Sequence, residues 1–173
     1  MRIEPPIRNA QSGAVLFVSL IMLLVLTVIG VTAMQTTTLE EKMAGNLRDQ
    51  TLAFQAAEAA LRAGESWLNT QTTQPVAQAS CSSACDTTVY KLNAYDVLSS
   101  TLLWDTASVR SYTGTLQKVK TAPKYLIEYH SFIPDSLVVG QPTTGRVAYR
   151  LTSRGTGGSD AARAVLQATY FKI

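Results

Sequence analysis

The hydrophobic and polar positions divide the chain into an apolar first quarter and a mixed remainder. Residues 14–34 contain no charged side chain, and the uncharged stretch continues to Leu39. About 20 apolar residues in an α-helix span the roughly 30 Å hydrocarbon core of a bilayer. The pattern therefore predicts a helix of transmembrane length near the N-terminus, in residues 14–34.

After this segment the apolar residues follow a helical periodicity. They recur at spacings of 4, 4, 7, 3, 4 and 7 residues, about 3.6 per turn, at Leu39, Met43, Leu47, Phe54, Ala57, Leu61 and Leu68. Charged residues mostly occupy the other faces, and no proline interrupts residues 7–74. We therefore expect one helix from about Ala14 to Leu68. Its continuation, residues 35–68, is amphipathic and is expected to pack a globular head with its apolar stripe.

A polar, proline-containing break ends the predicted helix at residues 69–78. The remaining chain, residues 69–173, is expected to form the head. Residues 86–122 mix short apolar groups with many serines and threonines and support no firm assignment. Trp104 and Tyr112 lie among them and are either core or contact residues, the core being the commoner case.

The end of the chain carries the pattern of an antiparallel sheet. Aromatic and β-branched residues, and alternation of apolar with polar ones, predict three strands and one glycine-rich turn. The strands are residues 124–133, 146–153 and 164–172, and the turn is residues 155–159. A long helix packed by one stripe on a small antiparallel sheet is an α+β fold.

The charges flanking the apolar segment predict its orientation. Arg2 and Arg8 precede it, and Glu40 and Glu41 are the first charges after it. By the positive-inside tendency, the N-terminus is cytoplasmic and the head extracytoplasmic. A cleaved secretory signal with a small-residue site at residues 31–33 is the alternative. Its apolar core would exceed the usual length of about 7–15 residues.

Net charge restricts the function only weakly. The chain has 15 Lys and Arg against 12 Asp and Glu, a net charge of +3. The head is mildly basic and could bind DNA or host surfaces, although an ordinary solvated surface is the commoner explanation. The basic residues that would form such a surface are Lys118, Lys120, Lys124, Arg146, Arg150 and Arg154.

Two cysteines and one histidine leave little room for metal or redox chemistry. Outside the cytoplasm, Cys81 and Cys85 are expected to close a small disulfide loop. A zinc site would need two more ligands, and only His130 is available. His130 also has Asp135 nearby, but no Gly-x-Ser-x-Gly motif supports a hydrolase. We therefore expect no catalytic site, no metal and no cofactor.

The N-terminal residues resemble those of type IV pilins. Residues 11–17, which read QSGAVLF, resemble a prepilin leader junction. Residues 36–46 (TTTLEEKMAGN) and 52–61 (LAFQAAEAAL) resemble the N-terminal region of PilX-type minor pilins. The resemblance implies a leader of residues 1–13, cleavage by a prepilin peptidase after Gly13, and methylation of the new N-terminal residue, Ala14.

One residue departs from the pilin pattern. Most type IV pilins carry glutamate as the fifth residue of the mature chain, where this chain has Val18. In that family the carboxylate is thought to pair with the terminal amine of the preceding subunit. An unpaired ammonium in an apolar filament core costs several kcal/mol. Val18 thus suits a first subunit, as in the GspK-type tip subunit of secretion pseudopili, unless neighbouring subunits compensate.

The resemblance implies a role in pilus assembly. We expect a minor pilin that takes part in priming the type IV pilus, in a tip complex with other minor pilins. Its partners would include the major pilin, a PilY-type tip adhesin, the prepilin peptidase and the inner-membrane assembly platform. It would lie in the inner membrane before assembly and at the pilus tip afterwards. A type II secretion minor pseudopilin and a DNA- or surface-binding module are the alternatives.

Overall fold

The computed structural model describes residues 12–81, 85, 88–95, 104, 108–136 and 144–172. The chain divides into two compact units, Met1–Gly45 and Asn46–Ile173, which are described separately. Most of the expected leader, and much of the stretch left unassigned by the sequence, lie outside the described residues.

One helix, α1 (Ser12–Thr70), runs through 59 residues and confirms the long helix that the periodicity predicts. In the first unit α1 contains only uncharged residues up to Leu39. Its hydroxyl side chains bond to the backbone of the preceding turn, as Ser19 does to the Leu16 carbonyl at 2.8 Å and Thr27 to the Leu24 carbonyl at 2.7 Å. Such bonds satisfy polar groups without water, which an apolar environment requires.

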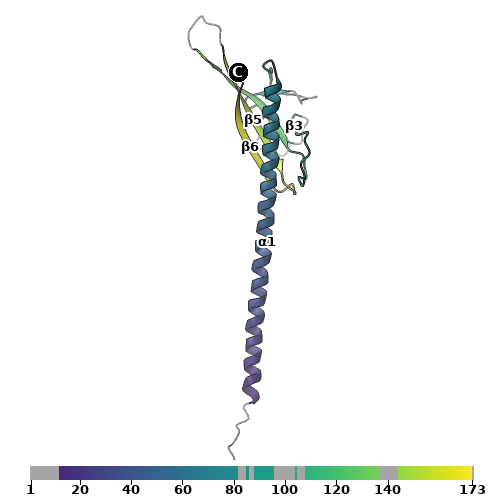
Figure 1. Ribbon diagram of the computed structural model, residues 1–173, viewed down its shortest axis with the longest axis vertical. Helices are drawn as coiled ribbons and strands as arrows, with labels where there is room; N and C mark the ends of the chain where they lie inside the picture. Colours follow the sequence, from purple (N-terminus) through teal and green to yellow (C-terminus); the bar gives the residue numbers. More distant parts are fainter. Residues whose placement is uncertain are drawn as a thin grey trace, which may run out of the picture. The chain divides into compact units, whose positions relative to one another are not determined.

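In the second unit, three long antiparallel strands confirm the predicted sheet. They are β4 (Lys124–Pro134), β5 (Gly145–Thr156) and β6 (Arg163–Lys172). Figure 1 shows β5 and β6 beside the last part of α1. The predicted turn begins too early, because Gly155 and Thr156 still pair with β6 through Ala164 and Arg163.

Three short strands extend the sheet beyond β4. They are β1 (Ala77–Gln78), β2 (Val89–Lys91) and β3 (Arg110–Ser111). The order is β1-β2-β4-β5-β6, with β1, β2 and β4 mutually parallel and β3 antiparallel to the start of β4. The sheet is therefore mixed. Strands of two or three residues carry too few positions for an alternating pattern, so the sequence could not predict them.

The core lies between the last part of α1 and the sheet. Tyr125, Ile127, Tyr149 and Leu151 from β4 and β5 are buried in it, and α1 adds Leu68. Trp104 is also buried, in a smaller cluster with Val109.

The helix face that packs on the sheet agrees with the predicted stripe only in part: Ala57 and Leu68 are buried, and Leu61 packs partly buried against the core. The buried positions before Leu68 are all small: Ala53, Ala56, Ala57, Ala60 and Gly64. Phe54 is 49% exposed and Leu47 is 66% exposed, whereas both were expected to pack the head. The reason is the closeness of β5. A Cβ added to Gly155 would lie 2.3 Å from the Ala53 carbonyl oxygen, so this approach leaves no room for large side chains.

Candidate functional site

The first unit presents an apolar surface with no internal partner. Its large side chains are 44–75% exposed from Val15 to Met34. Among the described residues, α1 is the one helix long and apolar enough to cross a membrane, judged by length and composition. Leaving a large apolar side chain in water instead of burying it costs about 1.5–3 kcal/mol. This part of α1 therefore needs lipid or other apolar helices around it.

The residues of the expected cleavage junction lie at the start of this helix. α1 begins at Ser12, and a Cβ added to Gly13 would meet no atom within 4 Å. Ala14 is exposed and Val18 is 54% exposed on the helix surface. No side chain of the described part before Glu40 carries a charge. The chain thus offers no carboxylate in its apolar segment that could take the place of a glutamate at position 18.

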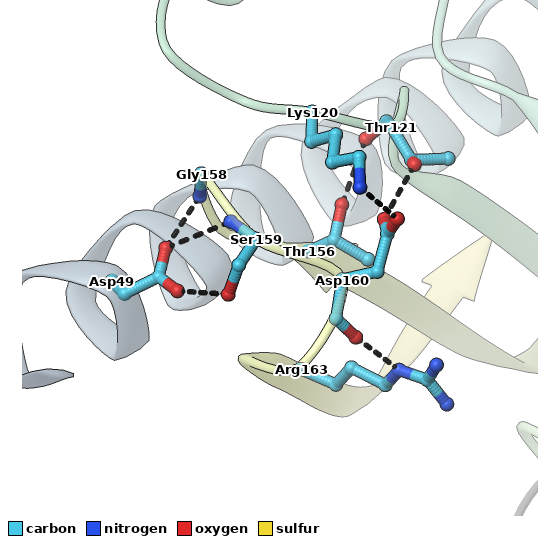
Figure 2. A network of polar contacts seen from close by, with 8 residues as sticks. All are labelled: Asp49, Lys120, Thr121, Thr156, Gly158, Ser159, Asp160 and Arg163. Atoms are coloured by element: carbon cyan, nitrogen blue, oxygen red, sulfur yellow. Dashed lines mark hydrogen bonds and ion pairs between the residues drawn. The ribbon is translucent and has the colours of Figure 1, made fainter.

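In the second unit, a polar clamp fixes the β5–β6 turn to α1 through Asp49. The Oδ1 atom of Asp49 accepts hydrogen bonds from the backbone N–H groups of Gly158 (2.5 Å) and Ser159 (3.2 Å). Its Oδ2 atom accepts a short one from the Ser159 hydroxyl. Figure 2 shows all three bonds converging on the one carboxylate. The Ser159 hydroxyl, followed by these backbone donors, holds the pKa of Asp49 below its usual value.

A second carboxylate fixes the same turn to the segment before β4. Asp160 pairs with Lys120 at 2.9 Å and accepts a hydrogen bond from the Thr121 hydroxyl at 2.8 Å. Lys120 is the main cause of the lowered pKa of Asp160. Arg163 donates to the Asp160 backbone carbonyl at 2.7 Å (Figure 2). The turn therefore joins two segments that are far apart in sequence, α1 and the segment before β4.

Glycines make this clamp possible. A Cβ at Gly157 would lie 2.2 Å from Oδ1 of Asp49. A Cβ at Gly155 would collide with backbone atoms of Ala53 and Ala57 at 2.3 and 2.4 Å. Backbone atoms cannot rotate away as a flexible side chain can. The glycine-rich sequence after β5 therefore serves close approach to α1 as well as the turn.

The end of α1 is capped by the last strand. The ammonium group of Lys172 donates to the carbonyl of Leu68 at 2.6 Å and also to that of Gln71. A cation at a helix C-terminus satisfies unpaired carbonyls and opposes the helix dipole. Asp49 and Lys172 thus fix α1 at two levels, about six turns apart at 3.6 residues per turn.

The disulfide between Cys81 and Cys85 is present, with the two Cα atoms 5.9 Å apart. Cys85 is buried and its carbonyl accepts from the Thr88 backbone at 3.1 Å. The Cys81 carbonyl accepts from the Ser108 hydroxyl at 3.3 Å. The loop therefore anchors the connection between α1 and β2. The residues between the two cysteines lie outside the described part.

Sequence reasoning gave Arg110 no role. Its guanidinium is buried 3.8 Å from the ring centroid of Trp67 and 5.9 Å from that of Tyr125, and it donates to the Thr88 carbonyl at 2.8 Å. Stacking on aromatic faces stabilises a buried arginine. A lone arginine among serines fits no periodic pattern, so the sequence did not predict this contact.

His130, the residue weighed for a catalytic role, contacts a neighbouring serine of its own strand. His130 is exposed at the irregularity of β4, where the register shifts between Tyr129 and Ser131. Its Nδ1 atom lies 3.1 Å from the Ser131 hydroxyl. Across the ranges that the structure describes, no three His, Cys, Asp or Glu side chains gather as metal ligands would.

Two of the six basic residues proposed for a DNA surface form ion pairs within the head. Arg150 pairs with the buried Glu128 at 2.7 Å, and Lys120 with Asp160. Lys124 and Arg154 line a hollow of about 250 Å³. The other residues that line it are Trp104, Thr121, Ala122, Thr156, Asp160 and Arg163. The structure does not bring the six together as one unengaged patch.

Comparison with known proteins yields two family matches. The PilX N-terminal family model matches residues 12–62. The model of the C-terminal part of type IV pilus assembly protein PilX matches residues 49–172. No curated protein and no solved structure shows a significant similarity to the chain.

Proposed function

Because the chain belongs to the PilX family of type IV pilus assembly proteins, we propose that it is a minor pilin that primes pilus assembly from a tip complex. Membership in this family and the long apolar helix support membrane anchoring and association with the pilus. The family is one of structural assembly proteins, not of enzymes. Priming and a place at the tip are the parts of the proposal that require a test.

The proposed life cycle follows from the division of the chain. Residues 1–13 form the leader, which the prepilin peptidase removes after Gly13, and Ala14 is methylated. Before assembly, residues 14–34 lie in the inner membrane. The head, residues 69–173, lies in the periplasm, where oxidising conditions maintain the disulfide. On assembly the same apolar residues pack among the helices of neighbouring subunits.

The observation that carries the tip placement is Val18. In the proposed filament, a subunit with a carboxylate at this position neutralises the terminal amine of the subunit placed before it, and an unpaired ammonium in the apolar core costs several kcal/mol. A subunit in the middle of a filament therefore needs this carboxylate, whereas a first subunit has no predecessor and does not. Val18 is a surface residue of a segment without any carboxylate. The chain therefore fits the first position, where no preceding amine needs a partner.

The experiment is replacement of the chromosomal gene by variants with Val18→Glu or, as a matched apolar control, Val18→Leu. Deletion of the gene should remove most surface pili, and Val18→Leu should restore them. Val18→Glu should lower the number of pili and place the protein along sheared filaments instead of at their ends, as seen by immunogold electron microscopy. Normal piliation with unchanged stoichiometry in Val18→Glu would contradict the tip placement.

The same strains distinguish a type IV minor pilin from a secretion pseudopilin. If deletion leaves pili intact but abolishes export of secreted enzymes, the chain serves a type II secretion system instead. Arg150 and Lys120 are paired within the head, and no observation favours DNA binding, so we do not propose it.

A further inference from the structure

The two ends of the sheet differ in the length of their outermost strands. β1 has two residues and is followed by β2 with three, so this edge exposes few backbone groups. At the other end lies β6 (Figure 1). It pairs with β5 through all ten of its residues without a register shift. A long, regular edge strand is a template for another strand.

The register identifies the outward-facing backbone groups of β6. The N–H of Gly157 donates to the carbonyl of Ala162 at 3.0 Å, which makes these two a hydrogen-bonded pair of the antiparallel ladder. Hydrogen-bonded and non-hydrogen-bonded pairs alternate along such a ladder. The non-hydrogen-bonded residues point their N–H and C=O groups away from β5. By this alternation and the register of β5 with β6, they are Arg163, Val165, Gln167, Thr169 and Phe171.

These outward groups have no backbone partner elsewhere in the described part of the chain. Between its two charged end residues, β6 also lacks the features that normally protect an edge. It contains no proline and no bulge, and residues 164–171 carry no charge. Val165 and Phe171 are 43% and 51% exposed beside the free edge. Lysines, prolines and bulges are the usual means of preventing strand addition, so an edge without them is suited to pairing.

We propose that the β6 edge binds an extended strand of a different extracytoplasmic pilus subunit, which continues the sheet beyond β6. Main-chain hydrogen bonds to the five outward residues would give affinity, and contacts with Val165 and Phe171 would give specificity. The partner strand is uncharged along its middle and carries an acidic residue where it meets Arg163.

Charge gives a second copy of this chain no advantage as the occupant. β6 contains no acidic residue, so antiparallel pairing of two β6 strands would offer Arg163 of either chain no partner of opposite charge. The proposal rests on membership in a pilus assembly family and on the free edge, and it is independent of a place at the tip.

Amide hydrogen exchange tests the edge directly. The full chain would be purified in detergent micelles, alone and co-expressed with the other minor pilins of the same pilus system, and exchange measured residue by residue. In the complex, the amides of Val165, Gln167, Thr169 and Phe171 should gain protection on the order of 100-fold. The alternate amides, such as that of Ala168, are already protected by β5 and should change little.

A proline variant provides the second test. Thr169→Pro removes one outward N–H and no bond to β5, whereas Thr169→Ala changes the side chain and keeps the N–H. Thr169→Pro should fold like the wild type by near-ultraviolet circular dichroism but lose at least about 10-fold in recovery of the complex; Thr169→Ala should retain it. Ala168→Pro, which breaks the ladder to β5, should instead lower the melting temperature.

Three results would overturn the proposal. The first is a complex whose outward amides exchange as fast as in the free chain, or no complex with any of these pilins. The second is equal recovery of the complex with Thr169→Pro and Thr169→Ala. The third is protection that appears with rising concentration of this chain alone, which would identify a second copy as the occupant. None of these results alters the family membership or the test of Val18.

Discussion

Two stretches of the same helix use apolar residues in opposite ways. Residues 15–34 carry leucine, isoleucine, valine, methionine and phenylalanine side chains that stay exposed in the isolated chain. Residues 53–64 bury alanine and glycine against β5 of their own head. The stretch with large apolar side chains therefore needs other molecules to cover it, whereas the stretch with small side chains is covered by the chain's own head. Hydrophobicity alone would have assigned the larger residues of the second stretch, such as Phe54, to the interior.

The largest effect should come from filling the space between β5 and α1. Gly155→Ala places a methyl group against backbone atoms at 2.3–2.4 Å, and we expect a loss of about 3 kcal/mol or failure to fold. Gly45→Ala is the matched control, because nothing lies within 4 Å of its Cβ position. It should gain up to about 1 kcal/mol from helix propensity. Thermal unfolding of the full chain in micelles, followed by near-ultraviolet circular dichroism, measures both; similar melting temperatures would contradict the close packing.

A charge in the first stretch should affect the membrane and not the head. Leu24→Lys, at the centre of residues 14–34, should cost about 3 kcal/mol of insertion free energy and reduce the fraction that resists carbonate extraction. The head of this variant should melt like the wild type. Leu47→Lys, at a residue 66% exposed in the second unit, should remain in the membrane. If carbonate extracted the two variants equally, the proposed difference between the two stretches would be wrong.

Removal of the disulfide should have an intermediate effect that is confined to the head. Double replacement of Cys81 and Cys85 by serine should lower the stability by about 2 kcal/mol, because the closed loop is short. Reduction of the wild type should give the same loss in a thermal melt. Membrane extraction should not change. A loss of membrane retention in the double variant would show that the two parts are coupled more closely than proposed.

The smallest effect should come from Asp49→Asn, and it should depend on pH. The folded-state pKa of Asp49 lies below the usual value of 3.8. Its carboxylate therefore stabilises the fold above about pH 4, and this stabilisation is lost as the pH falls through the folded-state pKa. The melting temperature of Asp49→Asn should be slightly lower than that of the wild type at pH 7, and the difference should shrink in acid. A difference that grows in acid would contradict the clamp.

The sequence predicted those features of the fold that repeat along the chain. The helix from Ser12 to Thr70 and the strands β4, β5 and β6 each contain enough residues for a periodic pattern. The membrane-length segment is likewise visible in composition. The residues expected at the cleavage junction, Gly13 and Ala14, and the residue at position 18 remain predictions about processing and assembly.

The remaining features depend on pairs of residues that no local pattern connects. Asp49 binds a turn 110 positions later, and Gly155 matters only because Ala53 lies against it. The stripe was predicted from apolar character. Near Gly155, however, the short distance between α1 and β5 leaves room only for small side chains. Arg110 is buried by aromatic contacts that become visible only when α1, β3 and β4 come together.

The most direct test of the account is the N-terminus of the mature protein. The chain would be expressed in cells with and without the prepilin peptidase and analysed by intact mass and N-terminal sequencing. The account predicts a peptidase-dependent product that begins at methylated Ala14 and keeps the whole apolar helix. A chain that remains uncut, or one that begins near Met34, would contradict assembly into a filament and indicate an ordinary anchored or secreted protein.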